Sequence, residues 1–471
     1  MALKKIFLGA GAMSSVTIIR MIAQMAIVPV LARLLTPEEY GLMGMAMPII
    51  LFIMIFSDIG VTGALLRTND RTHQKEWSSS FWAVMGMGGA LSCALVLAAP
   101  VIGWLLSEPR VVPIISTLAA VIFLQSLVTV PGAFLQYHKK FFILAGTEFI
   151  SMAASIGAVI FFALAGYGVW ALVLQQVVHY VLKCIFILML SGYQPRLEFD
   201  MPTIVPHLKF GKDVLGSSAM NTLSQMAISL LMGRFLGVEA VGIYTMAMLF
   251  VTLPARFAAA PLQFVLYPYL AKIQDRPDQF RDIFIFFTRI LVLIFVPSVF
   301  LLASAQASFF ALLLSAKWHG AGVLFAILTP MAAFQAFLSL RGTVAMLMGR
   351  PDILARQSFE YGMISILTSV LFLAFGLYHW AVVMMVVYLF YQLRGINMIL
   401  PLVEMQAWDY HRLWILPSLV ALTAVIVHQL LGGGLVLAVF LLGGCWATLL
   451  IREYPLWRQD YNRLRDVLGA E

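Results

Sequence analysis

Six basic residues lie within apolar stretches of this sequence, where a charge is costly. They are Arg20 and Arg256, near the middle of such stretches, and Lys183, Arg289, Arg341 and Arg394, nearer the ends. A charge at the bilayer centre costs at least about 2.5–3.5 kcal/mol on insertion scales, so these side chains should face a wet cavity or a partner. A guanidinium can grip a phosphate through two hydrogen bonds. We therefore predict that the six residues bind an anionic head group. For the four nearer the ends, snorkelling of the side chain to the membrane surface is the alternative.

Acidic partners for these cations are few. Asp58 lies deepest in the predicted membrane region, and Glu148 and Glu360 are expected close to its inner surface. Asp58 either neutralises Arg20 or a neighbouring cation, or takes up a proton during transport. An excess of buried cations over buried anions favours an anionic ligand over a purely internal network of ion pairs.

Three neutral polar residues also lie within apolar stretches: Gln24, Asn221 and Gln225. Their amides are suited to binding sugar hydroxyls, so they are candidates for a sugar path. Hydrogen bonding between membrane helices would explain the same residues equally well.

The composition is that of a membrane protein. Of the 471 residues, 62% are hydrophobic and 11% are charged, and the mean hydropathy is +0.95. A globular chain carries about a quarter charged residues, so apolar surface must here face lipid. Stretches of about 20 apolar residues cross a hydrocarbon layer of about 30 Å. We predict an all-α integral membrane protein with about fourteen spans, at 8–31, 40–66, 80–106, 111–136, 143–164, 168–190, 213–236, 242–270, 284–306, 321–347, 358–376, 379–400, 413–431 and 433–451.

Basic residues alternate between the two sides of the predicted membrane. About twenty Lys and Arg fall in one set of segments, which includes both ends of the chain. The opposite set holds Arg33, Arg110, Arg234 and Lys317. By the positive-inside rule, both termini face the cytoplasm of a bacterial inner membrane, and the first apolar run is an uncleaved span. The formal charge of +8 then reflects topology, and no nucleic-acid partner is expected.

Short outer loops argue against an enzyme. The longest has about fourteen residues, around 307–320, whereas polytopic glycosyltransferases, ligases and polymerases place catalytic residues in a large outer loop. Cys93, Cys184 and Cys445 lie inside predicted spans and show neither disulfide nor metal-ligand spacing. We expect no catalytic residues, no metal and no cofactor.

The chain repeats itself. At an offset of 201 residues, positions 24–47 and 225–248 share eleven identities in 24 ungapped positions, against roughly two expected by chance. At an offset of 210, residues 143–171 match residues 353–381, including Gly166 with Gly376 and Trp170 with Trp380. The matched glycines and polar residues keep a fixed register, so spans 1–6 correspond to spans 7–12.

A duplication of six spans predicts two similarly oriented lobes with a substrate site between them near mid-membrane, reached by alternating access. We predict an N-lobe over 1–190, a cytoplasmic linker over 191–212, a C-lobe over 213–400, an extra helix pair over 401–451 and an amphipathic cytoplasmic tail over 452–471.

Two runs carry a family resemblance. Arg33-Leu34-Leu35-Thr36-Pro37-Glu38-Glu39-Tyr40-Gly41 and Ser57-Asp58-Ile59-Gly60-Val61-Thr62-Gly63-Ala64-Leu65-Leu66-Arg67 resemble the opening of the polysaccharide transporter family. This family belongs to the multidrug/oligosaccharidyl-lipid/polysaccharide superfamily, and the nearest likeness is to Wzx-type flippases, in particular the colanic-acid-like branch. The resemblance covers essentially the whole chain, and it identifies the family well and the sugar poorly.

The resemblance implies that the chain flips an undecaprenyl-diphosphate-linked oligosaccharide from the cytoplasmic to the periplasmic leaflet, in the assembly of exopolysaccharide, O-antigen or lipopolysaccharide. Membrane lipid, and polymerase and chain-length proteins of the same pathway, would be its partners. In the related lipid II flippases, arginines on the first and eighth helices are associated with the diphosphate, and Arg20 and Arg256 lie on the corresponding helices.

Three other functions remain open at this stage. A drug or cation exporter of the same superfamily would need acidic residues deep in its cavity, where this sequence places arginines. An oligosaccharide polymerase or ligase would need larger outer loops. A scaffold without transport activity would leave the charges inside the membrane unexplained. The repeat unit, the coupling ion and the oligomeric state do not follow from the sequence.

Overall fold

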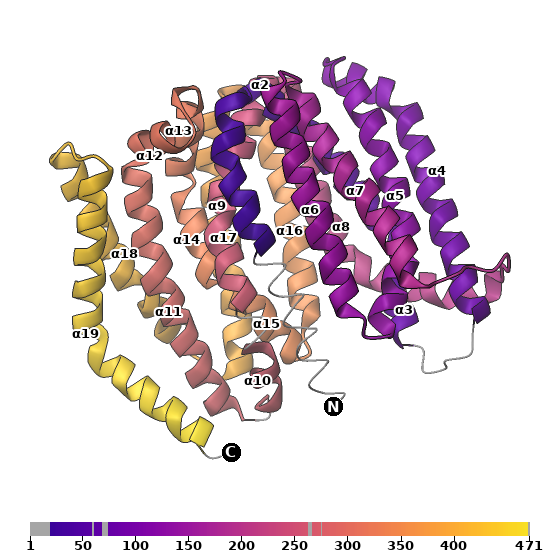
Figure 1. Cartoon of the computed structure of the whole chain (residues 1–471). Coiled ribbons are helices and arrows are strands. Elements are labelled where there is room, and N and C mark those ends of the chain that lie inside the picture. Colours follow the sequence, from indigo (N-terminus) through magenta and orange to yellow (C-terminus); the bar gives the residue numbers. More distant parts are fainter. Residues whose placement is uncertain (1–18, 59–60, 68–73, 262–265, 275, 470–471) are drawn as a thin grey trace. The chain divides into compact units, whose positions relative to one another are not determined.

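The described chain is built of helices that run side by side (Figure 1). This computed structural model describes residues 19–58, 61–67, 74–261, 266–274 and 276–469, and these contain no strand. By their internal contacts they form two compact units, residues 1–242 and residues 243–471. Each unit is described by itself below.

The first unit begins with a described helix over residues 19–34. It continues with α2 (Pro37–Asp58), α3 (Val61–Arg67), α4 (Gln74–Leu106), α5 (Val111–Tyr137), α6 (Phe141–Leu164), α7 (Val169–Ser191) and α8 (Met201–Leu236). Helices α4, α5, α7 and α6 pack side by side, and α8 packs against α2, α3 and α4. Short turns join α4 to α5, α5 to α6 and α6 to α7, so these neighbours in sequence run antiparallel.

The second unit contains most of α9 (Val238–Pro261), followed by further long and short helices. They are α10 (Tyr267–Lys272), α11 (Pro277–Ser304), α12 (Gln306–Leu313), α13 (His319–Ile327), α14 (Thr329–Phe337), α15 (Leu340–Leu347), α16 (Pro351–Phe372), α17 (Leu377–Ile399), α18 (Ala407–Leu430) and α19 (Leu435–Gly469). Helix α11 packs against α14, α18 and α19. The predicted long outer loop at 307–320 is itself largely helical, because α12 and a 3₁₀ turn (Ala316–Trp318) occupy it.

The membrane character of the helices is confirmed. Eleven described helices are long and apolar enough to cross a bilayer, and one bent pair adds a twelfth. Two of the fourteen predicted spans do not correspond to any of these twelve candidate membrane helices. Span 8–31 falls partly on residues 1–18, outside the described residues, and span 213–236 belongs to α8. The all-helical membrane fold is therefore established, and the count of fourteen stays a prediction.

One predicted span, 321–347, is broken. Helix α13 ends at Ile327 and α14 begins at Thr329, and the two pieces meet at an angle of 57°. Pro330 occupies the first turn of α14, where its missing N–H costs no hydrogen bond, but it cannot continue the helix before it. A second break separates α14 from α15 at Leu338 and Ser339.

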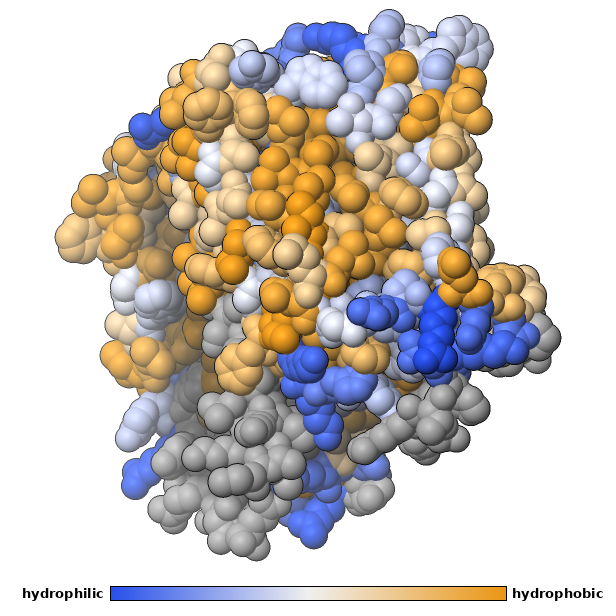
Figure 2. Space-filling view, turned by 45° about the vertical axis from the view of Figure 1, so that its right-hand side comes forward, coloured by the Kyte–Doolittle hydropathy of each residue, from blue (hydrophilic) through white to orange (hydrophobic). Residues whose placement is uncertain are grey.

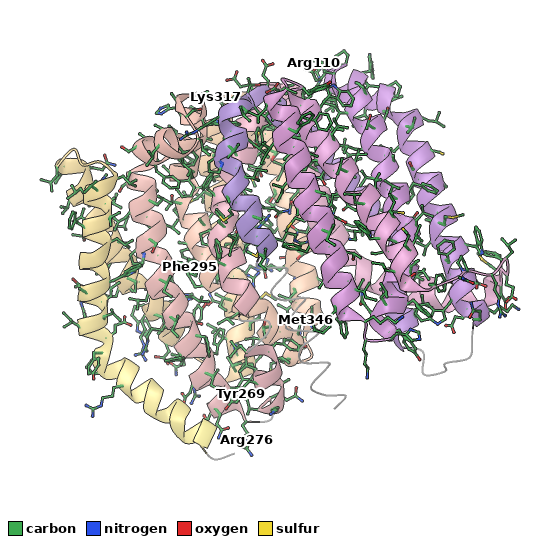
Figure 3. The ribbon with its side chains drawn as sticks, viewed as in Figure 1. Arg110, Tyr269, Arg276, Phe295, Lys317 and Met346 are labelled. Atoms are coloured by element: carbon green, nitrogen blue, oxygen red, sulfur yellow. The ribbon has the colours of Figure 1, made fainter. Side chains whose placement is uncertain are left out.

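The surface follows the same pattern as the sequence. On the face shown in Figure 2, hydrophobic side chains cover the middle of the helices and hydrophilic ones gather toward their ends. In the second unit, Lys317 and Arg276 lie at opposite ends of the helices (Figure 3), as the predicted alternation of basic loops requires. In the first unit, Arg110 lies in the turn between α4 and α5.

The predicted linker is largely helical at its carboxyl end. Helix α7 ends at Ser191 and α8 begins at Met201, so only residues 192–200 lie between the two helices, without regular secondary structure. The predicted tail forms one continuous helix with the last span, since α19 runs to Gly469. The apolar side chains that would make this tail amphipathic lie outside the described part of the chain.

Candidate functional site

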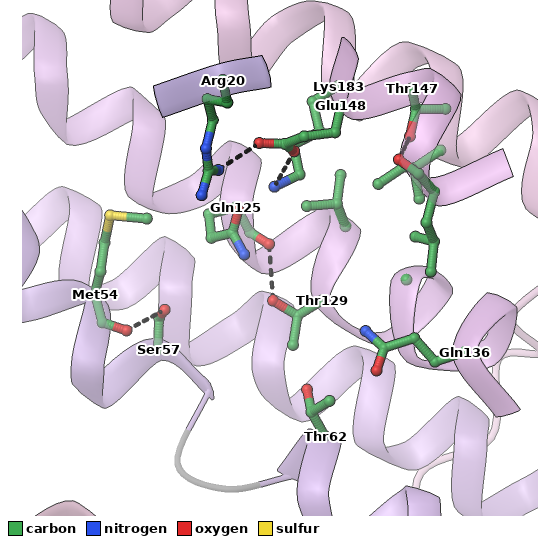
Figure 4. A pocket seen from close by; sticks show the side chains of 14 residues that line it. Arg20, Met54, Ser57, Thr62, Gln125, Thr129, Gln136, Thr147, Glu148 and Lys183 are labelled. Atoms are coloured by element: carbon green, nitrogen blue, oxygen red, sulfur yellow. Dashed lines mark hydrogen bonds and ion pairs between the residues drawn. The ribbon is translucent and has the colours of Figure 1, made fainter. Parts of the chain in front are cut away.

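A partly buried carboxylate contacts two basic side chains in the first unit. Glu148 of α6 accepts a hydrogen bond from Nη1 of Arg20 at 2.9 Å, and Nζ of Lys183 on α7 lies 3.3 Å from its other oxygen (Figure 4). The Nε2 atom of His179 lies 3.9 Å from the same carboxylate. Helical spacing puts His179 and Lys183 on one face of α7, four residues apart. Arg20 and Lys183, two predicted ligands, are thus brought together.

The cluster keeps an excess of positive charge. The basic side chains of Arg20 and Lys183 share this one carboxylate, so the described cluster holds more basic groups than acidic ones. The Glu148 side chain is 16% exposed, whereas that of Arg20 is 42% exposed. Arg20 can therefore offer further N–H donors to a ligand while one of its nitrogens contacts Glu148.

A cavity of about 470 Å³ adjoins this cluster. It lies within the range of small-ligand sites, roughly 300–1,000 Å³. Its wall is supplied by the helix over residues 19–34 and by α2, α3, α5, α6 and α7. Besides the charged residues, its polar lining consists of Ser57, Thr62, Gln125, Thr129, Gln136 and Thr147. Such hydroxyl and amide groups hydrogen-bond sugar hydroxyls without requiring a charge.

The cavity residues of α5 were not anticipated from the sequence. Gln125, Thr129 and Gln136 lie within a strongly apolar span, and their spacing of four and seven residues places them on one helical face. This spacing was the available signal. The predicted sugar-path residues behave differently, because Gln24, Asn221 and Gln225 are exposed and do not line this cavity.

The predicted role of Asp58 falls on a side chain outside the described part of the structure. Among the described residues, Glu148 is the carboxylate that contacts Arg20. Because Glu148 was expected near the inner surface, the sequence did not indicate that it contacts Arg20, a predicted ligand.

The other predicted cations lie in the second unit. Arg394 of α17 pairs with Glu360 of α16, which also accepts a hydrogen bond from Arg356 at 2.9 Å. Nε of Arg289, a buried residue, lies 3.7 Å from Glu453 of α19. Each of these arginines therefore has a carboxylate neighbour within its own unit.

Arg341 and Arg256 are held differently. Nη1 of Arg341 donates to the side-chain oxygen of Gln392 at 2.6 Å, and its buried Nε has no hydrogen-bond partner among the described residues. The buried side-chain oxygens of Thr288 and Tyr410 likewise have no hydrogen-bond partner among the described residues. Arg256 is exposed on α9. Its role as a ligand, like that of Arg341, stays a prediction.

The two units repeat one ion pair. Glu148 and Lys183 join α6 to α7, and Glu360 and Arg394 join α16 to α17. Glu360 follows Glu148 by 212 residues, and Arg394 follows Lys183 by 211 residues, so an ungapped alignment at 210 misses both. The fifth and sixth spans of each repeat thus share a carboxylate-to-cation contact.

The described residues contain no group of three His, Cys, Asp or Glu side chains that could hold a metal ion. The side chains that line the cavity offer cations, a carboxylate, amides and hydroxyls. This set can bind and release an anionic, hydroxyl-rich ligand.

The chain is similar in sequence to proteins of polysaccharide biosynthesis. A family model described as "Polysaccharide biosynthesis protein" matches residues 30–322. The succinoglycan biosynthesis transport protein ExoT of Rhizobium meliloti is 26% identical over 329 residues, which cover 68% of this chain and 66% of that protein. The lipopolysaccharide biosynthesis protein WzxC of Escherichia coli is 24% identical over 335 residues, covering 69% and 66%. The chain thus spans about two thirds of the length of these relatives.

Solved structures share the fold. A structure of the lipid II flippase MurJ in an inward closed conformation superposes with a TM-score of 0.76 at 12% identity, covering 94% of this chain and 99% of that one. An inward-facing multidrug resistance MATE family transporter of the MOP superfamily gives a TM-score of 0.62 at 15% identity, covering 81% and 95%. The predicted MATE-like and MOP-like fold is confirmed. Since the family model matches more than half of the chain, this protein belongs to the polysaccharide biosynthesis protein family.

Proposed function

We propose that this chain is a flippase that carries a lipid-linked oligosaccharide from the cytoplasmic to the periplasmic leaflet, in the assembly of a surface polysaccharide. The observation that carries the proposal is the cationic cluster of Arg20 and Lys183 beside a cavity lined by amides and hydroxyls. An undecaprenyl diphosphate head group with attached sugars has the matching chemistry, since it is anionic at one end and rich in hydroxyls beyond it.

In this proposal, the Glu148 carboxylate binds the two cations whenever no diphosphate is bound to them. In the described structure its carboxylate occupies the donors of Arg20 and Lys183. An arriving diphosphate competes for the same donors, and charge-assisted hydrogen bonds to phosphate replace those to the carboxylate. When the head group leaves, Glu148 takes the cations back. The two partly buried cations thereby keep an anionic partner after release, which limits the cost of releasing the ligand.

The predicted lobes supply the movement. A pair of six-span repeats favours alternating access, in which the lobes over 1–190 and 213–400 rock about the bound head group. Arg256 and the remaining predicted cations are proposed ligands along this path. The driving ion is left open, with Asp58 as a candidate proton site.

The proposal includes location and partners. The bias of basic residues supports a bacterial inner membrane with both termini in the cytoplasm. A flipped repeat unit must be consumed on the outer side, so a polymerase and chain-length proteins are the expected functional partners.

A drug or cation exporter is the competing function. Such a transporter needs a carboxylate that is free to bind a cationic drug. The carboxylate of the described cavity, Glu148, already contacts two cations, and the cluster as a whole is positive. An organic cation would be repelled there, so the geometry favours the anionic cargo.

The test is a leaflet-resolved transport assay with the double variant Arg20→Gln, Lys183→Gln. Loss of two charge-assisted contacts, each about 1.5–3 kcal/mol, should lower flipping of an undecaprenyl-diphosphate-linked saccharide at least 10-fold. Arg110→Gln is the matched control, because it removes an exposed guanidinium that lies outside the cavity. Normal flipping by the double variant, or an equal loss in the control, would refute the proposal.

A further inference from the structure

One face of α5 presents a row of three polar residues and a glycine to the cavity. Gln125, Thr129, Gly132 and Gln136 all line it, and their spacing of four, three and four residues keeps them in one row along the helix. At a rise of about 1.5 Å per residue, the row is roughly 16 Å long. We name these four residues the α5 stripe.

The side chains of the α5 stripe have unused hydrogen-bonding capacity. The Thr129 hydroxyl donates to the backbone carbonyl of Gln125 at 2.9 Å, which leaves its oxygen free to accept. The side-chain amides of Gln125 and Gln136 make no hydrogen bond to another described residue. Each amide offers two donors and one acceptor. The stripe can therefore both donate to and accept from a ligand rich in hydroxyls.

Gly132 opens a notch in the stripe. A Cβ atom added at this position would meet no protein atom within 4 Å, so open space lies beside its backbone. The notch lies between Thr129 and Gln136 in the row. A flat ring can lie against the bare helix there while the flanking side chains reach its edges.

Charged and neutral groups occupy different parts of the cavity. In Figure 4, the contact of Arg20 with Glu148 lies at one end, Thr129 lies further along, and Gln136 and Thr62 lie at the other end. An elongated ligand with one anionic end should therefore bind in a single orientation. Its anionic end meets the cations, and the portion that follows meets neutral polar groups.

We propose that the α5 stripe binds the uncharged sugar joined directly to the diphosphate, and that it sets the specificity for that sugar. The inference rests on the proposed function and deepens it. The stripe has amides, a hydroxyl and a notch but no cation, so it fits a neutral hexose or N-acetylhexosamine better than a uronic acid. A uronate would bring a second anion to the α5 stripe, whose four described residues offer no charge to balance it.

Binding by the purified full-length protein tests the inference. The probes are undecaprenyl diphosphate alone, and the same lipid carrying glucose, galactose, N-acetylglucosamine or glucuronic acid. The wild type should bind at least one neutral-sugar lipid several-fold more tightly than the bare lipid and than the glucuronate lipid. Gln125→Ala combined with Gln136→Ala should abolish this preference while binding of the bare lipid stays within about twofold.

Gly132→Leu provides a second measure that separates binding from folding. The added side chain meets no protein atom at its Cβ, so thermal stability should hold, whereas the filled notch should reduce binding of the sugar-bearing lipids at least several-fold. Gly146→Leu is the matched control, since Gly146 of α6 also has open space at its Cβ and does not line the cavity.

The outcomes separate this inference from the proposed function. If Arg20→Gln with Lys183→Gln weakens all lipids and the stripe variants weaken only the sugar-bearing ones, both stand. If the stripe variants keep the sugar preference, or weaken the bare lipid equally, the stripe inference is wrong while the flippase proposal survives. If the wild type prefers no sugar, the inference is likewise wrong. If the wild type binds none of these lipids, both fail.

Discussion

Gly41 and Gly242 lie against each other at equivalent positions of the repeat. A Cβ on Gly242 would come within 3.0 Å of the Gly41 nitrogen and within 1.8 Å of the Pro37 carbonyl oxygen. Reciprocally, a Cβ on Gly41 would lie 1.9 Å from the carbonyl oxygen of Val238. Both pairs are separated by 201 residues, so the first turns of α2 and α9 approach each other through matching residues. All four residues belong to the first unit.

Replacing Gly242 with Ala should destabilise the protein. The new methyl group would overlap a backbone oxygen, which cannot rotate away as a side chain can, so the first turn of α9 must shift. Overpacking of this kind costs about 1–3 kcal/mol. We expect a lower thermal midpoint in detergent. Gly443→Ala of α19 is the control, because a Cβ there meets no atom within 4 Å, and an equal drop in both variants would contradict the steric explanation.

Glu148→Gln should separate binding from turnover. Without the carboxylate, Arg20 and Lys183 lose their shared partner and stay available to phosphate. We expect tighter binding of undecaprenyl diphosphate, by roughly 10-fold, and slower flipping, because the ligand is no longer displaced; a charge-assisted contact of about 1.5 kcal/mol sets this scale. Equilibrium binding and single-turnover transport measure the two effects. Weaker binding by this variant would argue against competition between Glu148 and the head group.

The segment that joins α7 to α8 is fastened to the start of α4. The Ser78 hydroxyl accepts from the Arg196 amide at 3.0 Å, and that of Ser79 accepts from the Asp200 amide at 2.9 Å. Ser78→Ala with Ser79→Ala should leave both amides without these acceptors, at a cost of about 1 kcal/mol each. Hydrogen–deuterium exchange over residues 193–200 should accelerate several-fold. Thr448→Ala, which removes a bond within α19, should leave this segment unchanged.

Acid should loosen the turn between α4 and α5. Arg110 donates from Nε to Glu108 at 2.7 Å, and this hydrogen bond lowers the pKa of the Glu108 carboxyl. A lowered pKa means that the stabilisation is present above the ordinary value of about 4.3 and is lost as the pH falls through the folded-state value. Because Arg110 is half exposed, the contribution at pH 7 is at most about 1 kcal/mol.

Glu108→Gln should therefore lower the thermal midpoint slightly at pH 7, and the difference from the wild type should shrink as the pH falls through the lowered pKa of Glu108. Glu239→Gln serves as the comparison, since Glu239 is exposed. A difference for Glu108→Gln that grows on acidification would show that the sign is wrong.

The sequence by itself determined the helical membrane fold and the family. Length and hydrophobicity decide whether a segment can cross a bilayer, because every backbone polar group there must be satisfied within the helix. The described helices therefore follow the predicted spans, with a break before Thr329 as the main departure inside a span. The motif around Arg33 and the repeat in which Gly41 matches Gly242 could likewise be found from the sequence, because both are patterns along the chain.

Only the tertiary structure decided which side chains meet. Glu148 lies 128 residues from Arg20 and 35 residues from Lys183 in sequence, and no local pattern joins them. The α5 stripe shows the same limit, since its spacing reveals a shared face but not what that face borders. Which partner a side chain finds depends on the packing of helices distant in sequence, and hydrophobic packing fixes that arrangement without a signature in any single segment.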